Sequence, residues 1–112
     1  MRDTIAYKVL TAAEFAALQS GQFHGSPVDR ADGFIHLSIA SQLTETVDRH
    51  FAGQRDLSIV AVDLARLGSA VRWEASRQGQ LFPHLYASLT PAAVIAHCTL
   101  EREANGGIRL PQ

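Results

Sequence analysis

The chain has 112 residues, of which 46% are hydrophobic and 19% are charged, and its formal net charge is −1. A chain of this size supports one hydrophobic core, so we expect residues 1–112 to form a single domain. The composition excludes a chain that is disordered as a whole, and the near-neutral charge gives no overall attraction to nucleic acid or anionic lipid. The longest uninterrupted apolar run, residues 92–96, is much shorter than the ~18 residues of a membrane span.

Two features predict a cytoplasmic location. Cys98 is the only cysteine, so an internal disulfide bond is impossible and no oxidising compartment is needed. No apolar stretch of signal-peptide length follows the first residues. Cys98 also shares one face of a predicted strand with apolar residues, which favours an inert core thiol over a nucleophile.

The first half of the chain carries both strand and helix patterns. Thr11 and Glu14 fit a capping box, in which the threonine accepts from a backbone N–H and the glutamate reaches back to the start of the helix. Leu43, Val47 and Phe51 recur every fourth residue, which is the apolar stripe of a helix. The predicted elements are a strand at 5–10, a helix at 12–19, a loop at 22–33, a strand at 34–38 and a helix from about 41 to Gly53.

Strand patterns dominate the second half. Residues 57–62 are apolar on both faces, as in a central strand that is covered on both sides. The other predicted elements are a strand at 71–74, a polar loop at 75–80, an extended segment at 82–86, a short turn at 90–91, a strand at 94–100 and a frayed tail at 104–112. Five or six strands with two clear helices predict an α+β domain.

Polar side chains occupy alternating positions in three of the predicted strands. Because side chains alternate between the two faces of a strand, the polar residues of each strand share one face. We expect these faces to converge in one cleft that offers a general base, donors to an anion and an aromatic ring. The set consists of His36, Ser38, Arg72, Glu74, His84 and Tyr86.

The same residues admit other interpretations. A histidine on a strand is more often hydrogen-bonded scaffolding than a catalyst, and the whole set fits a buried hydrogen-bond network that fixes strand register. The five histidines include no closely spaced pair and no cysteine partner, so no metal site is predicted. The residues therefore leave the choice between an active site, a binding cleft and a structural network open.

Several blocks of sequence resemble one family. They are Asp-Gly-Phe-Ile-His-Leu-Ser at 32–38, His-Phe-Ala-Gly at 50–53, Trp-Glu-Ala-Ser-Arg at 73–77 and Phe-Pro-His-Leu-Tyr at 82–86. In this order they are similar to the domain of unknown function 952, a family of small, mostly bacterial proteins without an established activity. The resemblance covers about residues 7–100.

This resemblance implies a fold similar to the ADP-ribosyltransferase superfamily, a split and bent pair of β-sheets with two or three small helices. Members of that superfamily bind NAD between the half-sheets, using a basic residue of the first strand, a middle-strand residue and a late acidic residue. His36 and Ser38 match the middle-strand region here, and Glu74 is the candidate acid. In the first strand, at 5–10, the only basic residue is Lys8.

Together these observations predict a cleft for a small ligand such as NAD, ADP-ribose or a related nucleotide. Glu74 and His36 are the predicted catalytic residues, with Glu74 polarising a ribose hydroxyl. The predicted ligand-binding residues are Phe34, Ser38, Arg72, His84 and Tyr86. The alternative is a binding module without enzymatic activity for another metabolite, a peptide or a partner protein, and the sequence does not decide whether a reaction occurs.

Overall fold

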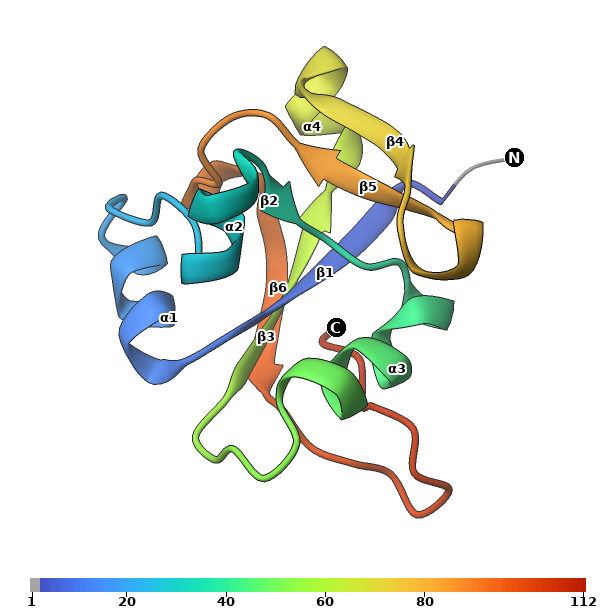
Figure 1. Ribbon diagram of the computed structural model, residues 1–112. Helices are drawn as coiled ribbons and strands as arrows, with labels where there is room; N and C mark the ends of the chain where they lie inside the picture. Colours follow the sequence, from blue (N-terminus) through green and yellow to red (C-terminus); the bar gives the residue numbers. More distant parts are fainter. Residues whose placement is uncertain (1–2) are drawn as a thin grey trace.

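Two antiparallel sheets of three strands each form the frame of the molecule (Figure 1). The computed structural model describes residues 3–112 and, of Arg77, the backbone only. The first sheet has the order β1-β3-β6, with β1 at Ile5–Leu10, β3 at Ser58–Asp63 and β6 at Val94–Thr99. The second has the order β2-β5-β4, with β2 at Ile35–His36, β5 at Leu81–Leu85 and β4 at Val71–Ala75.

Short helices pack around this pair of sheets. The α-helices are α1 (Ala12–Gln19), α2 (Pro27–Asp32), α3 (Ala40–His50) and α4 (Leu64–Leu67), and three 3₁₀ turns are at Gly68–Ala70, Arg77–Gly79 and Pro91–Ala93. In Figure 1, α1 and α2 lie on one side of the sheets and α3 lies on the other. The predicted α+β class and the split sheet with small helices are confirmed.

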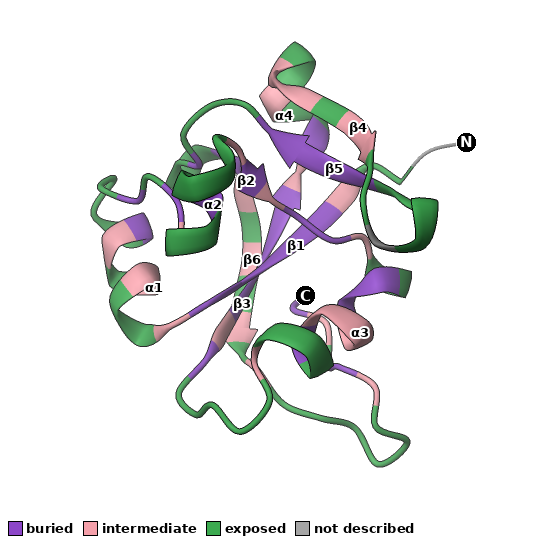
Figure 2. Cartoon of the chain, viewed as in Figure 1, coloured by how far each residue is buried: buried purple, intermediate pink, exposed green. Residues whose placement is uncertain are grey.

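The central strand of the first sheet is buried on both faces, as its uninterrupted apolar sequence predicts. Val60 and Val62 pack into one apolar cluster with Leu10 of β1, whereas Ile59 packs into a second cluster beneath α3, with Leu43. Figure 2 shows β3 and most of β5 as buried, with exposed residues concentrated in the helices and loops. A strand covered on both sides needs no polar face, so its hydrophobic run is continuous.

The strand predicted at 34–38 is divided between the two sheets. Ile35 and His36 pair with β5, whereas Ser38 pairs with β1 through an isolated bridge. The backbone N–H of Tyr7 donates to the Ser38 carbonyl at 2.7 Å, and the Ser38 N–H donates to the Tyr7 carbonyl at 3.0 Å. This bridge joins the first sheet to the second at the position where the site residues cluster.

The loop predicted at 22–33 is wrong for its second half, which is helix α2. Ser26 and Asp29 form a capping box, in which the Asp29 N–H donates to Ser26 Oγ and the Ser26 N–H donates to Asp29 Oδ2. Pro27 occupies the first helical turn and Gly33 ends the helix in the left-handed conformation, with φ of 86°. Proline and glycine therefore bound a helix here instead of marking a loop.

The tail at 104–112, predicted to be frayed, is ordered against the first sheet. Arg102 forms an isolated bridge with Ile108 and pairs with Asp48 of α3. The Ile108 side chain is buried in the apolar cluster beneath α3. The apolar side chain of Ile108 thus anchors a turn whose Asn-Gly-Gly sequence by itself indicated disorder.

Candidate functional site

A cavity of about 640 Å³ lies among β1, α2, α3 and β5. This is within the range of small-molecule sites, which also combine apolar walls with a few convergent polar groups. The basic and imidazole side chains in its wall are Lys8, His36, Arg49, His50 and His84, the hydroxyl groups include Ser38 and Thr46, and the phenyl and phenol rings are those of Tyr7, Phe51 and Phe82. The wall also contains two carboxylates, from Glu14 and Asp32.

His36 and His84 lie side by side in this wall. They are direct partners in the antiparallel pairing of β2 with β5, so their side chains share one face of the second sheet. Their ring centres are 5.5 Å apart, in an edge-on arrangement. We call these two residues the histidine pair.

A buried carboxylate, Asp29, holds His36 in place. Asp29 Oδ1 lies 2.6 Å from His36 Nδ1 and accepts the backbone N–H of His36 at 3.0 Å. The ammonium group of Lys8 lies 2.9 Å from Asp29 Oδ2, and that oxygen also accepts the Ser26 N–H at 2.9 Å. Asp29 is 1% exposed, so these contacts replace the water that an exposed carboxylate would bind. Asp29 therefore joins β1, α2 and β2 at one point.

The surroundings of Asp29 stabilise its charged form. Burial raises the pKa of the Asp29 carboxyl, but the hydrogen bond from His36 and the charge of Lys8 outweigh burial. The net result is a pKa well below the usual range of an aspartate. Asp29 is thus ionised throughout the physiological pH range, and it balances the positive charge of Lys8.

Asp32, at the end of α2, occupies the other side of the His36 ring. Its Oδ2 lies 2.9 Å from His36 Nε2. The side chain of Asp32 is 47% exposed and that of His36 is 32% exposed, so this contact is open to solvent, whereas the Asp29 contact is buried. His36 is thus fixed at Nδ1 by the buried Asp29, and its ring remains accessible from the cavity.

Glu74 orients the second member of the histidine pair. Its Oε1 lies 2.8 Å from His84 Nδ1 and accepts the hydroxyl of Tyr86 at 2.7 Å. The hydrogen bonds from Tyr86 and His84 lower the pKa of the Glu74 carboxyl, and the hydrogen bond to Glu74 raises the pKa of Tyr86. Because a carboxylate only accepts hydrogen bonds, the proton of His84 lies on Nδ1 in this contact.

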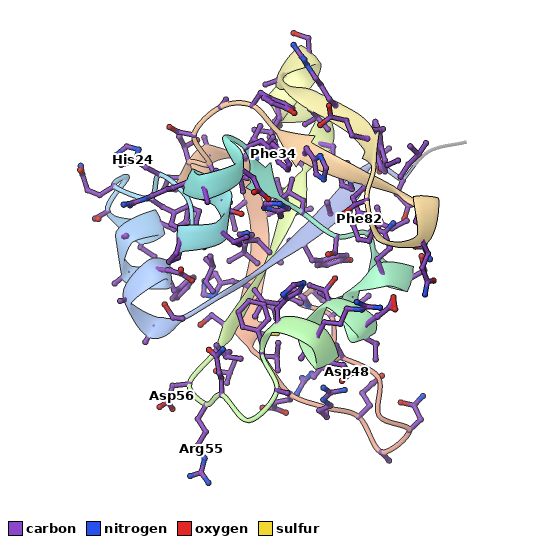
Figure 3. All side chains as sticks on the ribbon, in the orientation of Figure 1. His24, Phe34, Asp48, Arg55, Asp56 and Phe82 are labelled. Atoms are coloured by element: carbon purple, nitrogen blue, oxygen red, sulfur yellow. The ribbon has the colours of Figure 1, made fainter. Side chains whose placement is uncertain are left out.

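Aromatic contacts complete the support of His84. The ring of Phe34 is stacked on that of His84, with 4.1 Å between centres, and lies 4.6 Å from the ring of His36. Figure 3 shows Phe34 beside β2 and β5, with Phe82 farther along β5. The guanidinium carbon of Arg72 lies 4.7 Å from the ring centre of Tyr86, a cation–π contact.

The structure brings part of the predicted set to the cavity and places the rest behind it. His36, Ser38 and His84 line the cavity. Glu74 is not among its lining residues, and the two predicted catalytic residues are connected through His84, which contacts both. The other predicted residues, Phe34, Arg72 and Tyr86, contact His84, its partner Glu74 or one another.

The Lys8–Asp29 pair and Asp32 are site residues that the sequence reasoning missed. The Ser-Pro-x-Asp pattern at 26–29 is a helix start, and it contained enough information to place Asp29 at a helix terminus. Nothing local indicates the contact between Asp29 and Lys8, which are 21 residues apart in the chain. That contact exists because β1 and α2 pack together.

Within residues 3–112, no three or more His, Cys, Asp or Glu side chains are grouped so as to hold a metal ion. Over the same residues, no helix has the length and apolar character to cross a membrane.

The chain as a whole is similar to known proteins. The family described as "Protein of unknown function (DUF952)" matches residues 9–97. A crystal structure of protein CC0527 from Caulobacter crescentus is 45% identical in sequence, with a TM-score of 0.85, and the match covers 95% of this chain and 94% of that one. A solution NMR structure of CC0527, also 45% identical, gives a TM-score of 0.79 and coverages of 94% and 91%. No curated protein matches the chain.

Proposed function

Because the chain belongs to the DUF952 family of proteins of unknown function, we propose from its own geometry that the cavity binds a nucleotide-class ligand. The observation that carries this proposal is the histidine pair, two imidazoles fixed by carboxylates in the wall of a cavity of about 640 Å³. Binding groups held in place before the ligand arrives lose little entropy on binding. Such preorganisation is characteristic of ligand sites.

The wall of the cavity offers a group for each part of a nucleotide. Arg49, on α3, is half exposed and supplies a guanidinium for a phosphate group. Asp32 supplies a carboxylate for ribose hydroxyls beside His36. The rings of Tyr7 and Phe51 supply apolar surfaces for a base. ADP-ribose and NAD belong to this ligand class.

The residues do not fit the NAD-dependent transfer that the superfamily resemblance implied. The candidate acid, Glu74, lies outside the cavity wall, where its oxygen is engaged by His84 and Tyr86. The only basic residue of β1, Lys8, is paired with Asp29. We therefore propose nucleotide binding and derive no transfer step from Glu74.

Thermal-shift and calorimetric titrations with ADP-ribose, NAD and a nucleoside 2′-phosphate test this proposal. A ligand that binds only the folded state raises the unfolding temperature in proportion to its concentration. We expect stabilisation by at least one of these compounds at millimolar concentration. No stabilisation and no heat of binding with any of the three would contradict the proposal.

Two arginine variants localise the binding. Arg49→Ala removes a charge from the cavity wall and is expected to weaken binding about tenfold, because a hydrogen bond to a charged group is lost. Arg55→Ala is the matched control, since Arg55 extends from the loop between α3 and β3, away from the cavity wall (Figure 3). Equal affinities of the two variants would place the ligand elsewhere.

A second candidate function is a binding module without catalysis, and the hydrogen bonds of Asp29 favour it. Every hydrogen bond of this carboxylate is internal and joins elements of the scaffold, as expected of a structural network. Under that alternative, Glu74→Gln leaves ligand affinity intact. The His36→Ala variant then loses stability, because Asp29 loses a partner.

A further inference from the structure

The histidine pair has an arrangement that goes beyond ligand binding. We propose that His36 and His84 act as an acid–base pair that cleaves a phosphodiester next to a ribose 2′-hydroxyl in this cavity. The inference rests on the proposed nucleotide site and names its substrate class. Its physical basis is that the two rings, 5.5 Å apart between centres, have different hydrogen-bond partners.

The two rings differ at Nε2, the ring nitrogen that does not contact Asp29 in His36 or Glu74 in His84. His36 faces a carboxylate at both nitrogens, Asp29 at Nδ1 and Asp32 at Nε2. A neutral imidazole has one N–H, so both contacts are hydrogen bonds only when the ring carries two protons. His84 donates from Nδ1 to Glu74, and its neutral ring then has an acceptor at Nε2. The pair thus presents one donor and one acceptor.

In this inference the ligand supplies the nucleophile. Ser38 Oγ lies 2.9 Å from Thr46 Oγ1, so it is paired with another hydroxyl instead of a histidine. Cys98 is not among the residues that line the cavity. A ribonucleotide phosphodiester carries its own nucleophile, because its 2′-hydroxyl is adjacent to the 3′-phosphate. An attached nucleophile also has a large advantage in effective concentration.

The reaction balances with the two imidazoles alone. His84 Nε2 removes the proton of the 2′-hydroxyl while the O2′–P bond forms. The P–O5′ bond breaks, and His36 Nε2 gives its proton to the departing O5′. The products are a 2′,3′-cyclic phosphate and a free 5′-hydroxyl, and proton exchange with water restores the two rings.

Neighbouring residues position the pair and balance charge. Asp29 and Glu74 are positioning residues, since each holds one ring by Nδ1. Arg49, in the cavity wall, places positive charge near the phosphate, whereas the charge of Lys8 is balanced by Asp29. The half-exposed carboxylate of Asp32 contacts His36 Nε2, and the substrate displaces this contact.

Cleavage of a 3′,5′-linked diribonucleotide of uridine and adenosine, followed by liquid chromatography, tests the inference. We expect the wild-type protein to release adenosine and a uridine 2′,3′-cyclic phosphate, with a bell-shaped dependence of rate on pH. His36→Asn and His84→Asn are each expected to lower the rate at least about 100-fold. The analogue with a 2′-deoxyuridine should bind without being cleaved.

Two further variants, His97→Asn and Glu74→Gln, make the result specific. His97→Asn, prepared identically, is the matched control, because His97 is exposed and is not a lining residue. Cleavage that survives unchanged in His36→Asn or His84→Asn would overturn the inference and would indicate a contaminating nuclease. Since His84 is buried, Glu74→Gln gives an independent reading through a half-exposed residue. It should lower the rate and shift the pH profile, and an unchanged profile would contradict the positioning of His84.

Calorimetry with the 2′-deoxy analogue separates this inference from the proposed function. If the analogue binds and the diribonucleotide is not cleaved, the acid–base inference fails and nucleotide binding stands. If the analogue does not bind and none of the nucleotides stabilises the protein, both fail together.

Discussion

The two sheets of this protein have the same number of strands and the same antiparallel pairing but very different surfaces. In the first sheet, the central strand β3 carries Ile59, Val60 and Val62, none of which has accessible surface. In the second, the central strand β5 carries buried Leu85 on one face and His84, with its hydrogen bond to Glu74, on the other. The first sheet supplies more of the core than the second, which presents a polar face toward the cavity.

This difference means that the two sheets are stabilised by different forces. Burial of apolar surface in the first sheet depends on volume and hardly on pH. The site beside the second sheet depends on charges, with the buried carboxylate of Asp29 balanced by Lys8 and His36. Substitutions in the two regions should therefore respond differently to pH.

The largest effect is expected from Asp29→Asn, which removes the counter-charge of Lys8. Breaking a buried ion pair from one side costs about 3–5 kcal/mol of unfolding free energy, because the remaining charge is buried alone. Urea unfolding measures this loss. The control is Asp32→Asn, which alters a half-exposed contact and should cost under about 1 kcal/mol.

A double variant isolates the contribution of Lys8. Lys8→Met removes the charge that Asp29→Asn leaves unpaired, so the double variant should be more stable than the sum of the two single losses predicts. Strictly additive losses would show that the two residues do not interact.

A smaller loss is expected from Ile108→Ala, in the tail that packs beneath the first sheet. Ile108 retains a little exposure, so the cost should be about 2 kcal/mol, the low end of the range for buried isoleucine. The loss should be the same at pH 5 and pH 7, because only volume is removed. A stability equal to that of the wild type would show that the tail is detached in solution.

The acid dependence of stability should differ between wild type and Asp29→Asn. The pKa of Asp29 is lower in the folded protein than in the unfolded chain, so its contribution is complete above about pH 4 and is lost as the pH falls toward the folded value. Urea midpoints measured from pH 6 downward should fall more steeply for wild type than for the variant. Parallel curves would contradict the assignment.

The smallest effect concerns the pKa of Tyr86, which contacts Glu74 outside the cavity wall. The hydrogen bond to Glu74 raises the pKa of Tyr86, whereas burial raises the pKa of Tyr7. In Glu74→Gln, spectrophotometric titration should show one of the two tyrosines titrating at lower pH and the other unchanged. Repeating the titration in the Tyr7→Phe background assigns the shifted group. If Tyr86 does not move, the contact with Glu74 is not formed in solution.

The sequence predicted these two regions to different extents. The central strand of the first sheet was evident from its continuous apolar run. Alternation placed His36 and His84 on the polar faces of their own strands, but the pairing of these two residues across β2 and β5 became visible only in the structure. Alternation assigned Glu74 to a face of its strand, but it could not show that Glu74 contacts His84 from outside the cavity wall. Asp29 was missed because its partner Lys8 is remote in sequence.

NMR titration of the histidine side chains with ADP-ribose tests the central claim most directly, because it asks whether one ligand reaches both members of the histidine pair. With ¹⁵N-labelled imidazoles, the ring-nitrogen signals of His36 and His84 should move together and saturate at one ligand concentration. The signals of His24 and His97, which lie outside the cavity wall, should stay in place. Movement of neither His36 nor His84, or movement confined to His24 and His97, would contradict the account.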